Sequence, residues 1–138
     1  MWKFVPKIKK NESGQAVAEF AIVLPVLLLL LMGFIQFGFI FNGQVTVTSA
    51  AREGARLAVV GAADEAVKDR VEAAAAALLL NVNRNDININ RAVGGDDGVL
   101  SVTVTGSVDI VVPLLDMFTG PSFDVSSESV MRVEVKPQ

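Results

Sequence analysis

The longest apolar run of the chain lies between Phe20 and Phe41, and Gln36 is its only strongly polar residue. The run is 22 residues long, and about 20 apolar residues are enough for a helix to cross a bilayer. Residues 45–58 keep a partly helical spacing up to Gly61, which is expected to break the helix. The pattern therefore predicts one helix over residues 15–60, which crosses a membrane and continues outside it as a stem.

A second amphipathic helix is predicted over residues 64–81, with Asp64 as its N-cap and an i,i+4 ion pair between Asp64 and Lys68. Its apolar residues recur on one face. That face comprises Val67, Val71, Ala74, Ala75, Leu78 and Leu79.

Three segments alternate apolar and polar residues as strands do: residues 87–90, 100–112 and 131–135. Gly106 is the expected position of a bulge, and loops are expected at residues 94–98 and 113–121. A helix on a three-stranded antiparallel sheet, preceded by the long helix, gives an α+β fold. The expected organisation is a leader (1–14), a membrane helix with its stem (15–60) and a small domain (61–138).

Charge is divided unevenly along the chain. Residues 1–14 carry four lysines and Glu12, while the rest carries eight basic and 14 acidic residues. Lys and Arg are retained on the cytoplasmic side of a membrane. The N-terminus is therefore expected on the cytoplasmic side of the inner membrane, and the domain on the opposite side. The acidic domain has no basic patch for nucleic acid.

Catalytic chemistry has few candidates here. The chain contains neither His nor Cys, which removes the commonest general base and metal ligand and any thiol nucleophile. The acidic pair Asp96 and Asp97 lacks the spacing of a calcium loop. We therefore expect no enzyme activity, no metal and no cofactor.

Glu19 is an isolated carboxylate at the start of the apolar run. An ionisable group inside a membrane helix is costly, although less so near the end of the helix. Two interpretations remain: a residue that reaches the interface, or a carboxylate that finds a cation within an assembly. Cleavage between Gly14 and Gln15 would leave a new amine one helical turn from Glu19.

Further along the helix, three features invite interpretation. Pro25 is expected to kink the helix because it lacks an N–H and clashes with the preceding turn. Gln36 is expected to face protein rather than lipid. Arg52 and Arg56 share one side of the stem with Glu53 nearby, as a solvated flank or as a contact strip for acidic groups of a partner or of lipid head groups.

A basic leader, a Gly, four residues, a Glu and a long apolar helix together resemble the processing signal of type IV pilins and pseudopilins. The sequence GQAVAEF at residues 14–20, Pro25 and the sequence AAREGAR at residues 50–56 are similar to the TadE-like family. The family comprises pseudopilins of tight-adherence (Flp-type) pilus systems, and the similarity covers about residues 13–58.

The resemblance implies several properties. Gly14 would precede the bond cut by a prepilin-type peptidase, Gln15 would be the first mature residue, and Glu19 with Phe20 would set the register of packed helices. Partners would be other pilins or pseudopilins, the pilus assembly machinery and membrane lipid, with a location in the inner membrane or in an extracellular pilus. The function expected is a pseudopilin or minor pilin; the alternative is a monomeric binding domain on a single membrane anchor.

Overall fold

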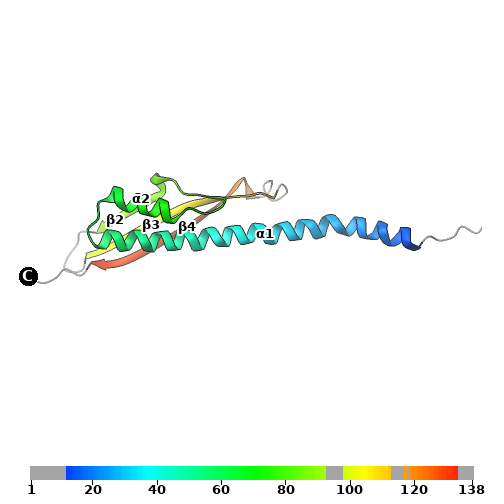
Figure 1. Cartoon of the computed structure of the whole chain (residues 1–138), viewed down its shortest axis with the longest axis horizontal. Coiled ribbons are helices and arrows are strands. Elements are labelled where there is room, and N and C mark those ends of the chain that lie inside the picture. The colour runs from blue at the N-terminus through cyan, green and yellow to red at the C-terminus, as the bar shows by residue number, and fades with distance from the viewer. Residues whose placement is uncertain (1–11, 93–97, 113–116, 118, 134–138) are drawn as a thin grey trace, which may run out of the picture. The chain divides into compact units, whose positions relative to one another are not determined.

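The computed structural model describes residues 12–92, 98–112, 117 and 119–133, and it divides into two compact units, Met1–Phe34 and Ile35–Gln138. Figure 1 shows the elements in chain order. They are α1 (Glu12–Val59), α2 (Asp64–Ala74), β1 (Leu80–Asn81), the 3-10 turn η1 (Arg84–Asp86), β2 (Ile87–Ala92), β3 (Gly98–Asp109) and β4 (Ser122–Val133). The predicted α+β fold is confirmed.

Helix α1 includes both the apolar run and the predicted stem, and the β-branched residues 45–48 remain helical. It ends as predicted before Gly61, which adopts a left-handed φ of 85°. The N–H of Gly61 donates to the carbonyl of Ala58 at 3.1 Å and that of Ala62 to the carbonyl of Leu57 at 3.3 Å. This is a Schellman arrangement, which uses the conformational freedom of glycine to satisfy the last carbonyls of a helix.

The sheet is antiparallel and is centred on β3. Strand β4 pairs with all of β3, from Gly98↔Val133 to Asp109↔Ser122, so β1 and β2 share the other edge of β3. The prediction of three strands was wrong in two respects: β1 adds a two-residue fourth strand, and β4 begins at Ser122 rather than near Met131.

The predicted bulge at Gly106 was also wrong, because the pairing with β4 continues without interruption through Gly106↔Val125. Glycine is required there by close approach. A Cβ on Gly106 would lie 2.8 Å from Val82 Cγ2 and 3.1 Å from the carbonyl oxygen of Asn81. The lack of a side chain at Gly106 lets residues 80–82 approach β3 closely.

One face of the sheet packs on the helices. Along β3, every second residue from Leu100 to Val108 is buried, and the residues that alternate with them are not. The buried residues are Leu100, Val102, Val104, Gly106 and Val108. Helix α1 meets this face with small residues at helical spacing, and α2 adds Val67 and Val71. The small residues of α1 in this contact are Gly43, Ala50, Ala51, Gly54, Ala55 and Ala58.

Helix α2 is shorter than predicted. It ends at Ala74 instead of Asn81, although the alanines and leucines that follow have high helix propensity. Leu80 instead pairs with Val108 in β1 and is buried, and Leu79 takes a positive φ of 62° to reach it. Tertiary packing of this leucine therefore outweighs local propensity.

Asp64 is not the cap of α2: Ala63 takes that position and no side chain caps it. The Asp64 carboxylate instead pairs with Arg91 of β2, at 2.8 Å, rather than with the predicted Lys68. Of the predicted loops, residues 94–97, 113–116 and 118 lie outside the described residues, as do residues 134–135 of the predicted last strand.

Glycine 54 provides a test of the close packing of α1. A Cβ at Gly54 would lie 2.5 Å from Val71 Cγ2 and 3.3 Å from Val102 Cγ1, whereas one at Gly38 would meet nothing within 4 Å. We expect Gly54→Ala to lower the free energy of unfolding by about 1–3 kcal/mol, and Gly38→Ala to leave it unchanged or raise it. Thermal unfolding followed by circular dichroism in detergent measures the stability of both variants. Equal changes in stability for Gly54→Ala and Gly38→Ala would contradict close packing at Gly54.

Candidate functional site

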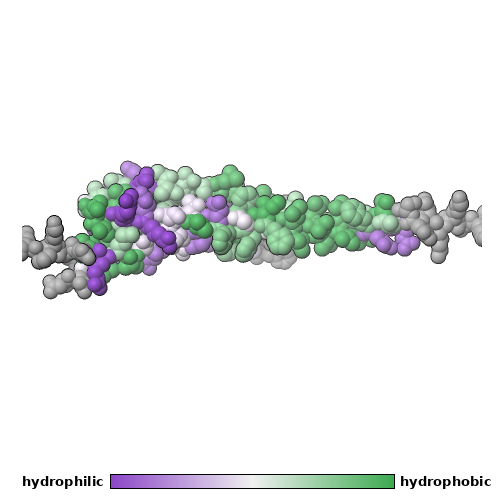
Figure 2. Space-filling view, turned by 60° about the horizontal axis from the view of Figure 1, so that its bottom comes forward, coloured by the Kyte–Doolittle hydropathy of each residue, from purple (hydrophilic) through white to green (hydrophobic). Residues whose placement is uncertain are grey.

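The N-terminal unit is an apolar helical surface. Large apolar side chains from Val17 to Phe34 are exposed all around α1, including Phe20 at 59% and Ile22 at 76%, and Figure 2 shows this half of α1 as almost continuously hydrophobic. Among the described residues, Gly14–Val59 is the one helix long and apolar enough to cross a membrane. Side chains of this kind are costly to leave in water.

Glu19 lies at the start of this surface beside Gln15. The amide Nε2 of Gln15 donates to Glu19 Oε1 at 3.0 Å, and both side chains are exposed. The spacing expected from the sequence therefore does bring residue 15 onto the carboxylate, one turn away. The contact supplies a neutral donor, so the negative charge of Glu19 remains uncompensated by it.

The bond between Gly14 and Gln15 lies in the first turn of α1, which begins at Glu12. The first N–H groups of a helix have no partner within the helix, so this turn is the least stabilised part of α1. Phe20 follows Glu19 and is exposed, and Pro25 lies inside α1. The kink at Pro25 stays a prediction.

Gln36 is 2% exposed and makes two hydrogen bonds to the segment that leaves β3. Its Nε2 donates to the carbonyl of Asp109 at 3.1 Å, and its Oε1 accepts from the N–H of Val111 at 2.8 Å. The prediction that Gln36 faces protein is confirmed, and its partner is this chain itself. Sequence alone gave no signal for that partner.

The stem residues Arg52, Glu53 and Arg56 are not equivalent. Glu53 Oε1 accepts from Arg70 of α2 at 2.9 Å and from Arg56 at 3.3 Å, and these guanidinium groups, Arg70 foremost, lower the pKa of Glu53. Arg52 is exposed and the side chain of Arg56 is 74% exposed. Glu53 thus joins α1 to α2, and the two arginines face outward.

The motif at residues 50–56 therefore divides between two surfaces. Ala50, Ala51, Gly54 and Ala55 are buried under the sheet and α2, while Arg52 and Arg56 are exposed. Four of its seven residues are thus explained by packing. A contact strip at Arg52 and Arg56 remains a proposal.

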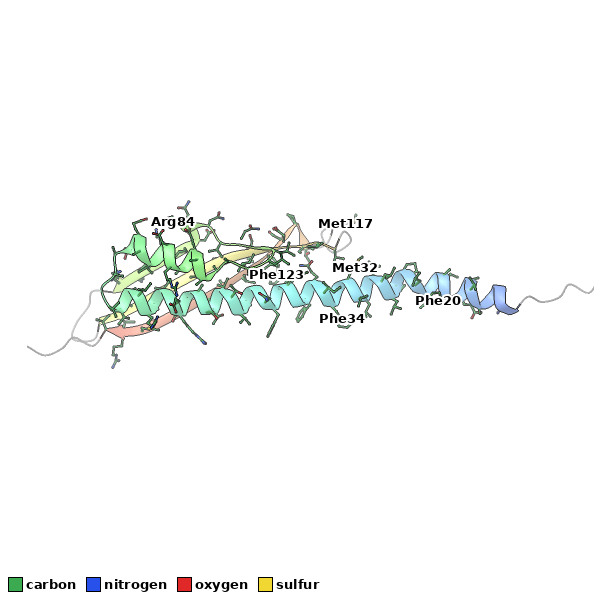
Figure 3. The ribbon with its side chains drawn as sticks, viewed as in Figure 1. Phe20, Met32, Phe34, Arg84, Met117 and Phe123 are labelled. Carbon is green, nitrogen blue, oxygen red and sulfur yellow. The ribbon has the colours of Figure 1, made fainter. Side chains whose placement is uncertain are left out.

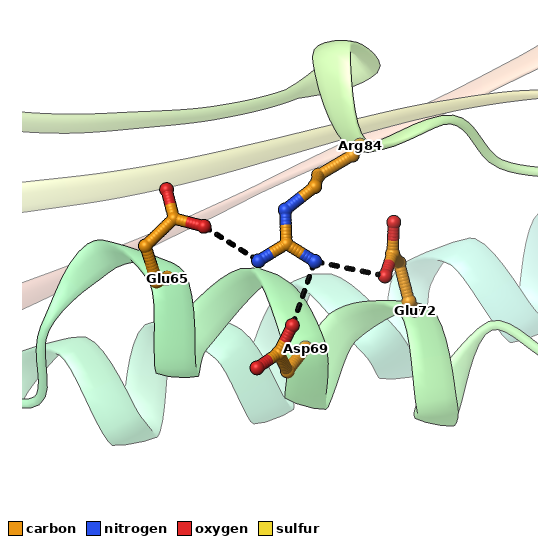
Figure 4. A network of polar contacts seen from close by, with 4 residues as sticks. All are labelled: Glu65, Asp69, Glu72 and Arg84. Carbon is orange, nitrogen blue, oxygen red and sulfur yellow. Dashed lines mark hydrogen bonds and ion pairs between the residues drawn. The ribbon is translucent and has the colours of Figure 1, made fainter.

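Sequence analysis missed the network around Arg84, shown in Figure 4. Its guanidinium contacts Glu65 and Asp69 at 2.6 Å each and Glu72 at 3.2 Å. The first two carboxylates raise the pKa of Arg84 further. The three acids share one face of α2, which the sequence spacing alone could have indicated, and they tie η1 to α2 with an excess of negative charge.

Arg91 joins the two helices to the sheet. Besides Asp64, it donates to the carbonyl of Ala62 at 2.7 Å and to that of Ala58 at 3.2 Å. A cation at the C-terminal carbonyls of α1 is favoured by the helix dipole. Arg84 and Arg91 therefore have structural explanations.

No group of three metal-ligating residues is found in the described part of the chain. The outward face of the sheet carries a shallow depression lined by Asn88, Ile89, Asn90, Ser101, Thr103 and Glu128. These lining side chains include one carboxylate and no pairing of a nucleophile with a general base. The depression is therefore a surface for weak polar contacts.

Comparison with known proteins identifies the N-terminal segment. Residues 14–56 match the family model described as TadE-like protein, which confirms the family indicated by the sequence motifs over this segment. No curated protein and no solved structure matches the chain. The match contains Gly14, Glu19, Pro25 and the motif at residues 50–56. It ends in the last turn of α1.

The ion pair of Glu53 predicts a pH dependence. Because folding lowers the pKa of Glu53, its stabilisation is present above the pKa of an unfolded glutamate, about 4.3, and is lost as the pH falls through the lowered value. We expect Glu53→Gln to reduce stability at neutral pH. The loss of stability between neutral pH and about pH 3 should therefore be smaller in this variant than in the unchanged chain. Thermal unfolding at both pH values is the measurement, and Glu128→Gln on the outward face of β4 is the control. If Glu53→Gln lost as much stability between the two pH values as the unchanged chain, the stabilising role of the Glu53 ion pair would be contradicted.

Proposed function

We propose, from the TadE-like match of residues 14–56, that the chain is a pseudopilin or minor pilin of a tight-adherence pilus or a related secretion apparatus. Its apolar run crosses the cytoplasmic membrane with the N-terminus inside and the sheet domain outside. It acts by lateral packing of N-terminal helices in the membrane or in the filament. The observation that carries the proposal is Glu19, a carboxylate at the start of an exposed apolar helix whose contact is the neutral amide of Gln15.

The exposed surface of α1 supports lateral packing. Apolar side chains surround the helix up to Phe34, so lipid and neighbouring helices can both cover it. Lipid alone would not favour a carboxylate at residue 19. A cation from a neighbouring subunit would stabilise it, and in a medium of low dielectric such a pair fixes axial register.

Processing would supply that cation. Cleavage by a prepilin-type peptidase after Gly14 would give Gln15 a charged α-amine, one turn from its own Glu19 and within reach of a neighbour's. The first turn of α1 would have to unwind for the bond to enter a protease, and its unpaired N–H groups make that turn the easiest to open.

The Glu19 proposal predicts a selective loss of assembly. We expect Glu19→Gln, which keeps the size of the side chain, to remain in the membrane but to lose incorporation into oligomers or pili. The measurement is the size of the complex after gentle detergent extraction, together with pilus content. Gln15→Leu is the matched control because it removes the hydrogen bond and keeps the charge. Normal assembly of Glu19→Gln would contradict the proposal.

The same measurement separates the second candidate, a monomeric domain held by one membrane helix. The polar depression on the outward face of the sheet favours this candidate. A monomer in mild detergent, insensitive to substitution of Glu19, is its expected behaviour. An assembly that depends on Glu19 is the expected behaviour of a pseudopilin.

Processing has its own test. The mass of the membrane-extracted chain should correspond to a start at Gln15 in cells that contain a prepilin-type peptidase, and to the full leader in cells that lack it. Replacement of Gly14 by a bulky residue should keep the leader attached. A start at Met1 or Trp2 in the presence of the peptidase would contradict cleavage.

A further inference from the structure

Apolar side chains are exposed at the end of the sheet where β3 leads toward β4. Val111 is 59% exposed, Met117 80% and Phe123 48%, and Figure 3 shows Met117 and Phe123 at this end of the sheet. In the same compact unit, Phe37 and Phe41 of α1 are 68% and 65% exposed. The buried core explains none of these five side chains.

The two hydrogen bonds of Gln36 fix where this end lies along α1. They hold the backbone of Asp109 and Val111 beside residue 36 of the helix. Gln36 precedes the end of the apolar run at Phe41 by five residues, which is about 7 Å along the helix. A span of about 20 residues that begins at Phe20 reaches to about residue 39. The segment after β3 therefore lies at the depth of the last turn of the proposed span.

Several polar groups of the described residues at this end have hydrogen-bond partners, which lowers the cost of a lipid environment. Gln36 is buried and uses both its amide nitrogen and its oxygen. The N–H of Ile110 donates to the carbonyl of Pro121 at 2.9 Å, and that of Asp109 to the carbonyl of Leu79 at 3.0 Å. The Asp109 carboxylate accepts from the neutral amide Nδ2 of Asn81 at 3.1 Å, so its charge suits the interface rather than the apolar layer.

We infer that this end of the domain, with Val111, Met117 and Phe123, enters the outer leaflet of the membrane beside α1. The domain then has two contacts with lipid: the helix that crosses the bilayer and the end of the sheet that rests in it. The inference relies on the proposed function for the span itself. The occupant is lipid rather than a second subunit because the segment is held beside residue 36 of α1, at a depth that the span sets.

The chain has no cysteine, so single cysteines can report the depth. We would introduce Val111→Cys and Met117→Cys in the full chain, attach a nitroxide label and reconstitute one copy per lipid nanodisc. Electron paramagnetic resonance then compares collisions with oxygen, which concentrates in lipid, and with a water-soluble nickel chelate. Leu30→Cys in the apolar run is the lipid reference, and Ser126→Cys on the outward face of β4 is the water reference.

The expected result is an oxygen-to-nickel ratio at residues 111 and 117 that is several times that at residue 126 and below that at residue 30, which lies near the centre of the span. Ratios like that at residue 126, with residue 30 still in lipid, would overturn the inference and leave the span intact. A water-like ratio at residue 30 would overturn the span and the proposed function with it. Low collision with both reagents at residues 111 and 117 would indicate a protein contact and would overturn the lipid assignment.

Discussion

Close contact between α1 and the sheet is the constraint on which the domain depends. Gly43 and Gly54 face Val108, Val71 and Val102 at distances that leave no room for a side chain. The buried residues of α1 between them are Val47, Ala50 and Ala51. Helices approach a neighbour closely only where their side chains are small. The half of α1 beyond residue 35 is therefore a core element of the domain. Four of the seven residues of the motif at residues 50–56 are buried in that contact.

The same helix carries two different solutions to a polar group in apolar surroundings. Gln36 is buried and bonded within the chain to the backbone of Asp109 and Val111, so it adds stability to the fold of the single chain. Glu19 is exposed, and the amide of Gln15 cannot neutralise it. A satisfied amide supports folding, whereas an uncompensated carboxylate on an apolar surface favours association, and this difference is why the proposed function is placed at Glu19.

Local patterns predicted much of this fold. The long helix, its end before Gly61, residues 87–90 of β2 and most of β3 follow from apolar periodicity and from glycine. The errors arise where distant residues decide: α2 stops early because Leu80 is needed opposite Val108, and Gly106 is set by the approach of Asn81 and Val82 rather than by a bulge. For the site, the spacing of Gln15 and Glu19 was predictable because both lie on one helix. The partners of Gln36 and Arg84 and the bond of Glu53 to Arg70 were not, because each of these bonds joins elements whose proximity only the folded chain creates.

Strand β4 pairs with β3 along its whole length, and in the described residues no strand covers its other edge. Gln44 Nε2 of α1 donates to the carbonyl of Ser126 in this strand at 2.9 Å. Among the described residues the 12-residue strand has no strand partner on that edge, and such an edge is a template on which a second copy can add by backbone pairing. Asp124, Glu128 and Arg132 place a charge at every fourth residue of this strand, on its exposed face. In a parallel stack in register each of these side chains would lie opposite the same charge on the next copy, so fibre-like growth through β4 in that register is opposed electrostatically.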